Sequence, residues 1–342
     1  MESVTIMDIA RLCGVGVSTV SRAINNHPDI SEDTKAMILK VIKEHNYIPN
    51  NSARNLKRSD SKTIAILIKG ISNPFFNAMI KVFEQEIELM KYSFLLHRVD
   101  DHENEIDVAL ELEKEKRLKG IVFLGGYFSH SEEELKGLKV PFVLSTVGLT
   151  KLVNKSSYLS VAVDDRKESY KLVDYLCKLG HKRIAIICSN PEDVSIGRLR
   201  LDGYKLALKD NDIPLDNDLV RYNRDIESYS MKYGYETTKE LLQSDIDVTA
   251  IYAISDSMAV GACKAIFDVG KKIPEDYSVA GFDGMDIAFY YNPSITTIRQ
   301  PVKEMAYETI HILFDIIDKK KNRESKVFPA ELVIGQSTST LK

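Results

Sequence analysis

The sequence predicts an all-helical N-terminal unit followed by a larger α/β core of two lobes. The first sixty residues hold three short helical patterns and no strand pattern. From residue 63 onward, short β-branched runs alternate with amphipathic helical patterns, which is typical of parallel sheets joined by right-handed crossovers. About eleven such runs exceed one comfortable sheet, so we expect two lobes with a break near residues 158–165.

The first helix of the N-terminal unit begins with a capping signal. Thr5 followed by Asp8 has the form of a capping box. Apolar residues then recur at i, i+3, i+4 and i+7, which predicts one buried face made of Ile6, Ile9, Ala10 and Cys13. Gly14 ends this helix.

Two more helical patterns follow this turn. Residues 17–25 form a helix whose inward side chains are Val20, Ala23 and Ile24. The opposite face of that helix then carries Val17, Ser18, Ser21, Arg22 and Asn25. Ser31 can cap a third helix, with an inward stripe of Met37, Ile38, Val41 and Ile42.

The stretch "GVGVSTVSRAINNHP" raises the possibility of a nucleotide-binding loop, because two glycines are followed by hydroxyl side chains. The dinucleotide fingerprint needs a strand before the glycines and a third glycine. Here a helix precedes them and Thr19 stands at the third position. What remains is a helix, a glycine turn and a helix with a polar face, the form of a helix-turn-helix; an ordinary corner between two helices is the alternative.

Length, composition and cysteine use exclude several classes of protein. The chain has 342 residues, of which 44% are hydrophobic and 28% charged, so it is long enough for two or three globular domains. No run approaches the roughly 18 apolar residues that span a bilayer. The N-terminus "MESVTIMDIARLC" lacks a signal core, so we expect a cytoplasmic protein without membrane contact.

The four cysteines do not have the spacing of metal ligands. We therefore predict reduced thiols and no metal site at Cys13, Cys177, Cys188 and Cys263.

The charge distribution points weakly to the N-terminal unit as the part that meets nucleic acid. The formal net charge is −4, which alone argues against such a partner. Residues 1–59, however, carry eight Lys and Arg against six Asp and Glu. The following segment "NSARNLKRSDSKT" is polar and basic, and a helix over residues 50–56 is too short to be stable alone.

Several motifs in order resemble the LacI/GalR family of bacterial transcriptional regulators. The N-terminal motif is "VTIMDIARLCGVGVSTVSRAINNHPDISEDTKAMILKVIKEHNYIPNNSARNLKRSDSKTIAILIKGISNPFF". It is followed by "LGHKRIAII", "GRLRLDGY", "ISDSMAVGA", "IPEDYSVAGFDG" and "PSITTIRQP", so the resemblance covers essentially the whole chain.

The resemblance implies a domain plan. The helix-turn-helix headpiece occupies residues 1–49, a hinge helix and linker residues 50–62, and the effector-binding and dimerisation core residues 63–342. The core is expected to consist of two Rossmann-like lobes resembling periplasmic binding proteins. The expected N-lobe covers about 63–160 and 291–322, and the expected C-lobe about 161–290 and 323–342.

The resemblance also implies how DNA is read. The base-reading positions fall on Val17, Ser18 and Arg22, and Arg22 can fork onto a guanine. Phosphate contacts are expected from Thr5, Thr19, Ser21, Asn25 and Tyr47, although a hydroxyl can equally serve as a helix cap or face solvent. In the hinge, the implied residues are Asn50, Ala53, Arg54 and Leu56. Leu56 would wedge into the minor groove.

Such a hinge implies a homodimer on a pseudo-palindromic, double-stranded operator. The chain ends at "STSTLK" without a heptad tail, so we expect a dimer and not a tetramer. Binding to the operator would place the protein at the nucleoid.

For the small-molecule effector, the resemblance implies a site between the lobes and no cofactor. The matching positions are Asn73, Phe75, Phe76, Thr146, Arg200, Tyr229, Asp256 and Asp283. Taken without the family, the two phenylalanines are typical of a core and Arg200 of a helix surface. Carboxylates, a guanidinium and aromatic rings suit a polyol, so a sugar is expected.

Two departures from the family leave the effector open. Thr146 stands where many members have an aspartate, and Gly70 replaces another aspartate. A nucleobase or a sugar phosphate is therefore the second possibility, and Lys69 could favour an anion.

Other functional classes fit less well. A cytoplasmic sugar-sensing or solute-binding protein that does not touch DNA would have no use for residues 1–59. An enzyme is not expected either, because there is no Gly-x-Ser-x-Gly motif and the seven histidines form no metal-ligand group.

Overall fold

The computed structural model describes most of the chain. The described residues are 4–24, 27–45, 47, 62–69, 73–100, 103–126, 130, 132–148, 158–189, 191, 195–223, 227–320 and 323–341. The chain divides into two compact units, residues 1–61 and residues 62–342. Each unit has its own hydrophobic core.

The first unit contains the three expected helices, α1 (Ile6–Leu12), α2 (Val17–Ile24) and α3 (Glu32–Glu44). The capping box of α1 forms: the Asp8 amide donates to Thr5 Oγ1 (3.3 Å), and the Thr5 amide donates to Asp8 Oδ2 (3.0 Å). Ser31 caps α3 by accepting from the Thr34 amide at 3.3 Å.

A small core joins these helices, made of Ile9, Ala10, Val20, Ala23 and Ile38. Met37 was expected to be part of the inward stripe of α3, and this expectation is wrong because its side chain is 41% exposed. The helix packs through Ile38, Val41 and Ile42, whose i, i+3, i+4 spacing defines a narrower stripe.

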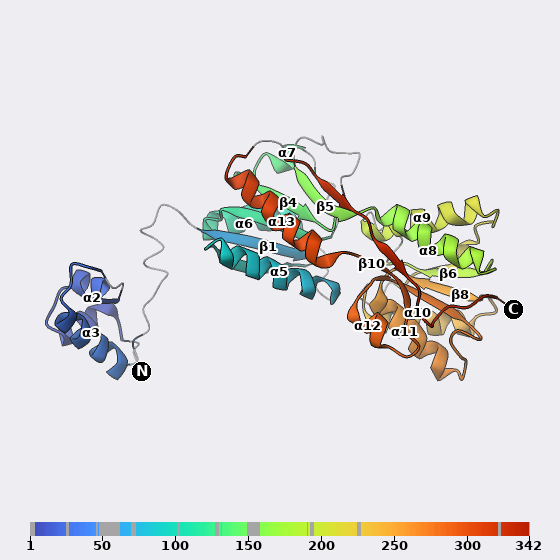
Figure 1. The fold of residues 1–342 in the computed structure, drawn as a ribbon, viewed down its shortest axis with the longest axis horizontal. Coiled ribbons are helices and arrows are strands. Elements are labelled where there is room, and N and C mark those ends of the chain that lie inside the picture. The colour runs from blue at the N-terminus through green and yellow to red at the C-terminus, as the bar shows by residue number, and fades with distance from the viewer. Residues whose placement is uncertain are drawn as a thin grey trace. The chain divides into compact units, whose positions relative to one another are not determined.

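The second unit contains two six-stranded sheets (Figure 1). The first sheet, in the N-lobe, has the order β11-β5-β4-β3-β1-β2, and all its pairs are parallel. In chain order its strands are β1 (Thr63–Lys69), β2 (Ser93–Val99), β3 (Gly120–Gly125), β4 (Phe142–Ser145), β5 (Leu159–Val163) and β11 (Lys326–Phe328). Its helices are α5 (Phe75–Leu89), α6 (Glu105–Lys116), α7 (Glu132–Leu135) and α13 (Val302–Ile317).

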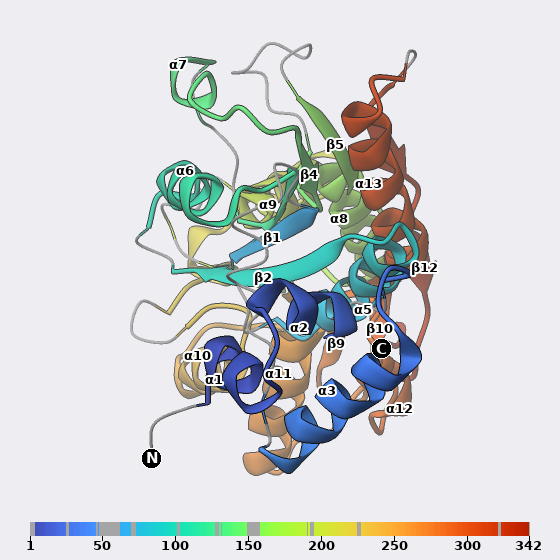
Figure 2. The same cartoon turned by 90° about the vertical axis from the view of Figure 1, so that its left-hand side faces the viewer.

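Both faces of this sheet are covered, which explains why its strands are continuous apolar runs. Along β1, Ile64, Ile66 and Ile68 face one core and Ala65 and Leu67 the other, as the two-residue period requires. Figure 2 shows α5 and α13 on one side of the sheet and α6 and α7 on the other.

The second sheet, in the C-lobe, has the order β12-β10-β9-β8-β6-β7, and β12 is its antiparallel strand. Its strands are β6 (Ile184–Ile187), β7 (Val220–Arg221), β8 (Ala250–Ala253), β9 (Ser278–Asp283), β10 (Thr296–Arg299) and β12 (Glu331–Val333). Its helices are α8 (Asp165–Lys178), α9 (Ile196–Asp210), α10 (Met231–Gln243), α11 (Asp256–Asp268) and α12 (Asp286–Tyr290), with a 3-10 turn η1 (Asn217–Leu219).

The chain crosses between the sheets after β5, after β10 and after β11, and these crossings correct the expected lobe boundaries. We expected residues 291–322 in the N-lobe; α13 lies there, but β10 pairs with β9 of the C-lobe. We expected residues 323–342 in the C-lobe; β12 lies there, but β11 pairs with β5 of the N-lobe. An apolar run predicts a strand but not its partner, and β11 was not anticipated because it has three residues. No described helix is both long and apolar enough to cross a membrane.

Candidate functional site

Helix α2 presents the side chains expected to read DNA. Val17 is 42% exposed, Ser18 and Arg22 are exposed, and Thr19 and Ser21 are half-buried. On the other face, Val20 and Ala23 are fully buried against α1 and α3. The packing therefore fixes which face of α2 remains free for a partner.

The turn before α2 depends on Gly14 and Gly16 for different reasons. Gly14 has φ +65°, a left-handed conformation that suits glycine. Gly16 has no such conformation, and its carbonyl accepts from the amides of Thr19 and Val20 at 2.9 and 3.2 Å. Gly16 thus directly precedes α2, and its carbonyl accepts the first hydrogen bonds of the helix.

The remaining expected DNA contacts have mixed positions. The Thr5 hydroxyl donates to Asp8 Oδ2 at 2.6 Å, so it is already used in the capping box. Tyr47 is half-buried and packs against the headpiece core. The other expected contacts lie outside the described residues, namely Asn25, Asn50, Ala53, Arg54 and Leu56.

In the core, the expected effector residues follow the carboxyl ends of parallel strands, where α/β folds place their ligands. Asn73 follows β1 of the N-lobe, and Asp283 ends β9 of the C-lobe. The Asn73 side-chain amide donates to Asp283 Oδ2 at 3.3 Å, and Asn73 Oδ1 accepts from the Phe75 amide at 3.1 Å. The carboxyl ends of the two sheets therefore meet at this pair.

Arg200 is the cation of this site. It lies on α9, is 1% exposed, and donates from Nε to Asp165 Oδ1 at 2.8 Å. Its NH2 lies 3.4 Å from Asp283 Oδ1, its NH1 donates to the Ile254 carbonyl, and its guanidinium lies 3.6 Å from the Phe282 ring centre. Burial works against the charged form, but Asp165 and Asp283 outweigh it and raise the pKa of Arg200.

Asp256, the first residue of α11, has both carboxylate oxygens hydrogen-bonded. Oδ1 accepts from the Thr297 hydroxyl at 2.6 Å and Oδ2 from the Met285 amide at 2.7 Å. Burial, followed by the negative charge of Asp283, raises the pKa of Asp256 well above its usual value.

The site therefore holds more buried carboxylates than cations. Asp165, Asp256 and Asp283 are each at most 2% exposed, and among the described residues Arg200 is the guanidinium that pairs with Asp165 and Asp283. Burial raises the pKa of Asp165 and raises that of Asp283 to about 6, although Arg200 opposes both shifts. The site is rich in hydrogen-bond acceptors and holds three buried carboxyl groups against one guanidinium.

The other expected effector residues have different surroundings. Phe75 and Phe76 are 4% and 5% exposed and make an edge-to-face pair at 5.6 Å, as core residues do. Tyr229 is half-buried, has φ +64°, and contributes to the pKa of Arg200, so it lies near the guanidinium. Thr146 follows β4, is 5% exposed with φ +69°, and its hydroxyl has no hydrogen-bond partner among the described residues.

Sequence reasoning missed three polar residues of this cluster. They are Asp165, Thr297 and Gln300, whose Nε2 donates to Asp283 Oδ1 at 3.0 Å. Asp165 carried a usable signal, because it belongs to the acidic pair that follows the apolar run "SVAV", at the carboxyl end of β5. Gln300 carried none, since its role depends on the chain crossing between lobes at that residue.

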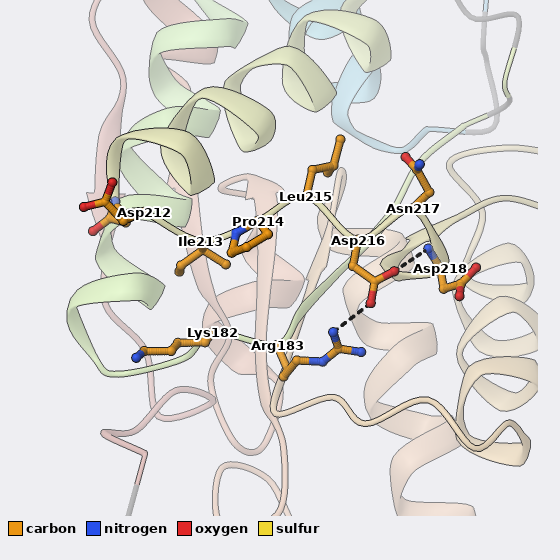
Figure 3. Close-up of a pocket in the computed structure, with 10 residues that line it drawn as sticks. Lys182, Arg183, Asp212, Ile213, Pro214, Leu215, Asp216, Asn217 and Asp218 are labelled. Atoms are coloured by element: carbon orange, nitrogen blue, oxygen red, sulfur yellow. Dashed lines mark hydrogen bonds and ion pairs between the residues drawn. The ribbon is translucent and has the colours of Figure 1, made fainter.

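A hollow of about 930 Å³ lies elsewhere, at the amino end of β6 (Figure 3). It is lined by Lys182, Arg183 and residues 211–218, and contains none of the expected effector residues. Two of its charged side chains pair with each other, because Arg183 Nη1 donates to Asp216 Oδ2 at 2.7 Å. This hollow lies at the edge of the sheet opposite to Asp283.

Comparison with known proteins bears on both units. Residues 5–50 match the family model "Bacterial regulatory proteins, lacI family", and residues 173–338 match "Periplasmic binding protein-like domain". The transcriptional regulator MalR of Clostridium butyricum is 43% identical over 333 residues, which cover 96% of this chain and 97% of that protein.

Solved structures are similar over nearly the whole length. A complex of the transcriptional regulator CelR with cellobiose has 26% identity and a TM-score of 0.70, and the match covers 98% of this chain and 99% of that one. The lac repressor dimer bound to operator has 23% identity and a TM-score of 0.72, covering 99% and 100%. The second comparison supports the fold alone.

Proposed function

Because this chain belongs to the LacI family of bacterial regulatory proteins, and is therefore a DNA-binding transcriptional regulator and not an enzyme, we propose that it represses carbohydrate-utilisation genes under the control of a sugar. In this proposal the headpiece, residues 1–49, and the hinge, residues 50–62, both bind a pseudo-palindromic operator, and the protein is a homodimer. The core, residues 63–342, binds the sugar between its lobes. Such a regulator acts in the cytoplasm, at the nucleoid.

We assign base reading to Val17, Ser18 and Arg22, because these side chains share the exposed face of α2. Arg22 can make a bidentate contact to guanine, whereas Val17 offers apolar contact to a thymine methyl group. Thr5, Thr19, Ser21, Asn25 and Tyr47 are assigned to phosphates, and Asn50, Ala53, Arg54 and Leu56 to the hinge.

The excess of buried carboxylates is the observation that favours a neutral polyol as effector. A sugar brings hydroxyl donors to Asp165, Asp256 and Asp283, while Arg200 can donate to a sugar oxygen. A sugar phosphate would add negative charge beside three buried carboxylates, which is unfavourable. The cellobiose bound by the similar CelR supports the same class of ligand.

We assign the effector contacts to Asn73, Thr146, Arg200, Tyr229, Asp256 and Asp283, with Phe75 and Phe76 as apolar neighbours. Thr146 is a strong candidate, because a buried hydroxyl without a partner is costly until a ligand binds it. The expected aspartate at this position is absent, so the pattern of hydroxyls recognised should differ from that of relatives that have it.

A homodimer fits the exposed apolar side chains of the core. On the described surface, Leu89 is 72% exposed, Tyr290 88%, Val327 64% and Ile334 63%. Val327 lies on β11, the edge strand of the N-lobe sheet, and an exposed apolar side chain at such an edge can be buried by a second copy of the chain. Analytical ultracentrifugation of the full chain tests this assignment.

The DNA assignment is tested by measuring the preference for operator over scrambled DNA. The operator is first selected from a randomised duplex pool with wild-type protein, and binding is followed by fluorescence anisotropy. Arg22→Ala should lose roughly ten- to a hundred-fold in the preference for operator over scrambled DNA. Arg11→Ala, an exposed arginine on α1, is the matched control. Equal preference in Arg22→Ala and wild type contradicts the assignment of the reading helix.

The effector is tested by thermal shift with mono- and disaccharides including cellobiose, sugar phosphates and nucleosides. A hit should also change operator affinity. We expect a neutral sugar to stabilise the wild type and not Arg200→Ala. A sugar phosphate or nucleoside hit, or a sugar shift that survives Arg200→Ala, contradicts the assignment.

A further inference from the structure

The N-lobe has a basic edge that the proposed function does not use. We call this edge the N-lobe rim: the described residues that precede its strands, namely 62, 90–92, 117–119, 136–141, 158, 318–320 and 323–325. Among these described residues are nine cations and two anions, Asp318 and Glu324. The cations are Lys62, Lys91, Arg117, Lys119, Lys136, Lys139, Lys319, Lys320 and Arg323. The whole chain has a net charge of −4, so the charge of the rim is opposite in sign to the net charge of the protein.

These cations point to solvent and are largely uncompensated. All are exposed except Arg323, which is half-buried. Within the described parts of the chain, Lys320 is the rim cation that forms an ion pair, with Asp315 Oδ1 at 2.6 Å. Lys62 lies 5.7 Å from the centre of the Tyr92 ring, a contact that retains its charge.

Three rim cations occupy positions that favour glycine. Lys91, Arg117 and Lys319 follow α5, α6 and α13 with φ of +61°, +50° and +56°. A left-handed residue at the end of a helix is usually glycine, because a Cβ is unfavourable there. A long cationic side chain is therefore present at three positions where glycine would fit the backbone conformation with less strain.

The C-lobe provides an internal comparison. Its corresponding segments are residues 179–183, 211–219, 244–249, 269–277 and 291–295, and among these described residues four cations face seven anions. The left-handed residues after α8, α9 and α11 are Gly180, Asp212 and Gly270. A cation near a helix C-terminus complements the helix dipole, which could by itself explain the basic residues of the rim. Helices end at this edge in both lobes, however, and only the N-lobe has an excess of cations there, so the dipole does not account for it.

The rim lies where the linker to the headpiece is attached. Lys62 begins the core directly after the hinge segment and precedes β1, which starts at the end of the N-lobe that points away from the C-lobe (Figure 1). We infer that the N-lobe rim is a second DNA-binding surface, which contacts backbone phosphates of the duplex held by the headpiece. This inference rests on the proposed binding of an operator by the headpiece.

Such contacts would add affinity without sequence preference. Exposed lysines and arginines neutralise phosphates and release counterions, which makes binding depend on salt. Each phosphate contact contributes about 0.9 to the slope of log K against log salt concentration. Bases are still read by α2, so the ratio of operator to scrambled DNA binding is independent of the rim.

The test replaces Lys91, Arg117 and Lys319 together with glycine in the full-length protein. Glycine suits all three backbone conformations, so the thermal unfolding temperature should not fall. Operator binding is titrated by anisotropy between about 50 and 200 mM NaCl, on a duplex with flanking DNA. We expect a loss of on the order of ten-fold in affinity and a slope shallower by about 0.9 for each lost contact.

Two control variants separate charge from other effects. The triple variant Lys182→Gln, Lys271→Gln and Lys272→Gln removes the same charge from the C-lobe and should bind as wild type does. The variant Lys91→Arg, Arg117→Lys and Lys319→Arg keeps the charges and should retain the wild-type slope. An unchanged slope in the glycine variant, an equal loss in the C-lobe control, or a charge-conserving variant as weak as the glycine variant overturns the inference.

The specificity ratio distinguishes this result from failure of the proposed function. The glycine variant should keep the wild-type ratio of operator to scrambled DNA binding, whereas Arg22→Ala should lower that ratio. If wild type itself shows no preference for any selected sequence, the proposed function fails, and the salt slopes on the same DNA still test the rim. A glycine variant with a lower ratio of operator to scrambled DNA binding but an unchanged salt slope contradicts the inference about the rim and does not affect the assignment of the headpiece.

Discussion

Asn73 donates its side-chain amide to the carboxylate of Asp283 over 3.3 Å, although the two residues are 210 positions apart and belong to different lobes. The same carboxylate accepts from Gln300, which lies at the crossing after β10, and faces Arg200 of the C-lobe. One buried group thus contacts both lobes and a segment that joins them. A ligand that competes for Asp283 would alter the contact between lobes, which is how differential binding can shift a conformational equilibrium.

Asn73→Asp should convert this contact into repulsion. The aspartate can still accept from the Phe75 amide, so the start of α5 is preserved. Two carboxylates at this separation would repel, and we expect a larger radius of gyration by small-angle scattering and effector affinity reduced on the order of ten-fold. Asn77→Asp, at an exposed position of α5, is the control. Lowering the pH to about 5 should restore the contact because one carboxyl then takes a proton. An unchanged radius at neutral pH would show that the contact does not hold the lobes together.

Asp283→Asn should remove a pH dependence from the stability of the core. Burial raises the pKa of Asp283 to about 6 from 3.8, so its contribution to folding stability is complete below about pH 4 and is lost as the pH rises through 6. Asparagine cannot ionise, so the variant lacks this loss, although its amide group faces the donors of Asn73 and Gln300. Measured by urea unfolding, the unfolding free energy of the variant relative to wild type should rise by on the order of 3 kcal/mol between pH 4 and pH 7.5. Asp286→Asn, at an exposed site three residues away, should show no such pH-dependent gain. A gain that is equal at both pH values would exclude titration of Asp283 as its cause.

The sequence was sufficient for most elements of the fold because those elements are defined by local patterns. The capping box of Thr5 and Asp8, the two faces of α2 and the apolar strands all depend on residues within one or two turns of each other. The lobe to which β10 belongs depends instead on pairing with β9, and β11 has only three residues. Neither fact is visible in a local window.

The same distinction applies to the site. Asp283 and Arg200 could be proposed from family motifs, and the structure brings them within 3.4 Å of each other. Asp165 contacts Arg200 across 35 positions and Thr297 contacts Asp256 across 41, so their roles follow from tertiary packing. Arg200, which would pass for a surface residue on its helix, is buried by the carboxylates of the cluster.

Gly16→Ser should strengthen the start of α2, the helix proposed to read bases. A side chain at Gly16 meets Ser18 Oγ at 3.5 Å, an ordinary contact, and its backbone needs no left-handed conformation. A serine hydroxyl can accept from a free amide of the first turn, which glycine cannot do. We expect a gain of a few tenths of a kcal/mol in headpiece stability, followed by hydrogen exchange of the α2 amides. Gly14→Ser, at φ +65°, should lower stability, and the idea fails if both substitutions act alike.

Gly261→Ala should disrupt the packing of α10 on α11. A Cβ on Gly261 would lie 2.0 Å from the Met231 carbonyl oxygen, and one on Gly234 would lie 2.0 Å from that of Met258. Both obstacles are backbone, so the helices must separate, and we expect a loss of about 3 kcal/mol in unfolding free energy. Gly270→Asn, at a left-handed position with open space around it, should be nearly neutral. A loss at Gly261 no greater than that at Gly270 would mean that the helices adjust freely.

Asp165→Asn should lower the pKa of Asp283 while leaving the site folded. The asparagine oxygen can still accept from Arg200 Nε, which now lies 2.8 Å from Asp165 Oδ1, so the guanidinium keeps its position. Asp165 raises the pKa of Asp283 by repulsion, and its removal leaves Arg200 to act mainly on Asp283. The pH dependence of unfolding attributed to Asp283 should therefore move to lower pH. The neighbouring Asp164→Asn is a matched control, because asparagine also caps α8 and the same charge is lost from an exposed site. If both variants move the midpoint equally, general electrostatics and not the Arg200 pairing sets the pKa of Asp283. If only Asp165→Asn moves it, Asp165 is the residue that positions and balances the guanidinium in the proposed effector site.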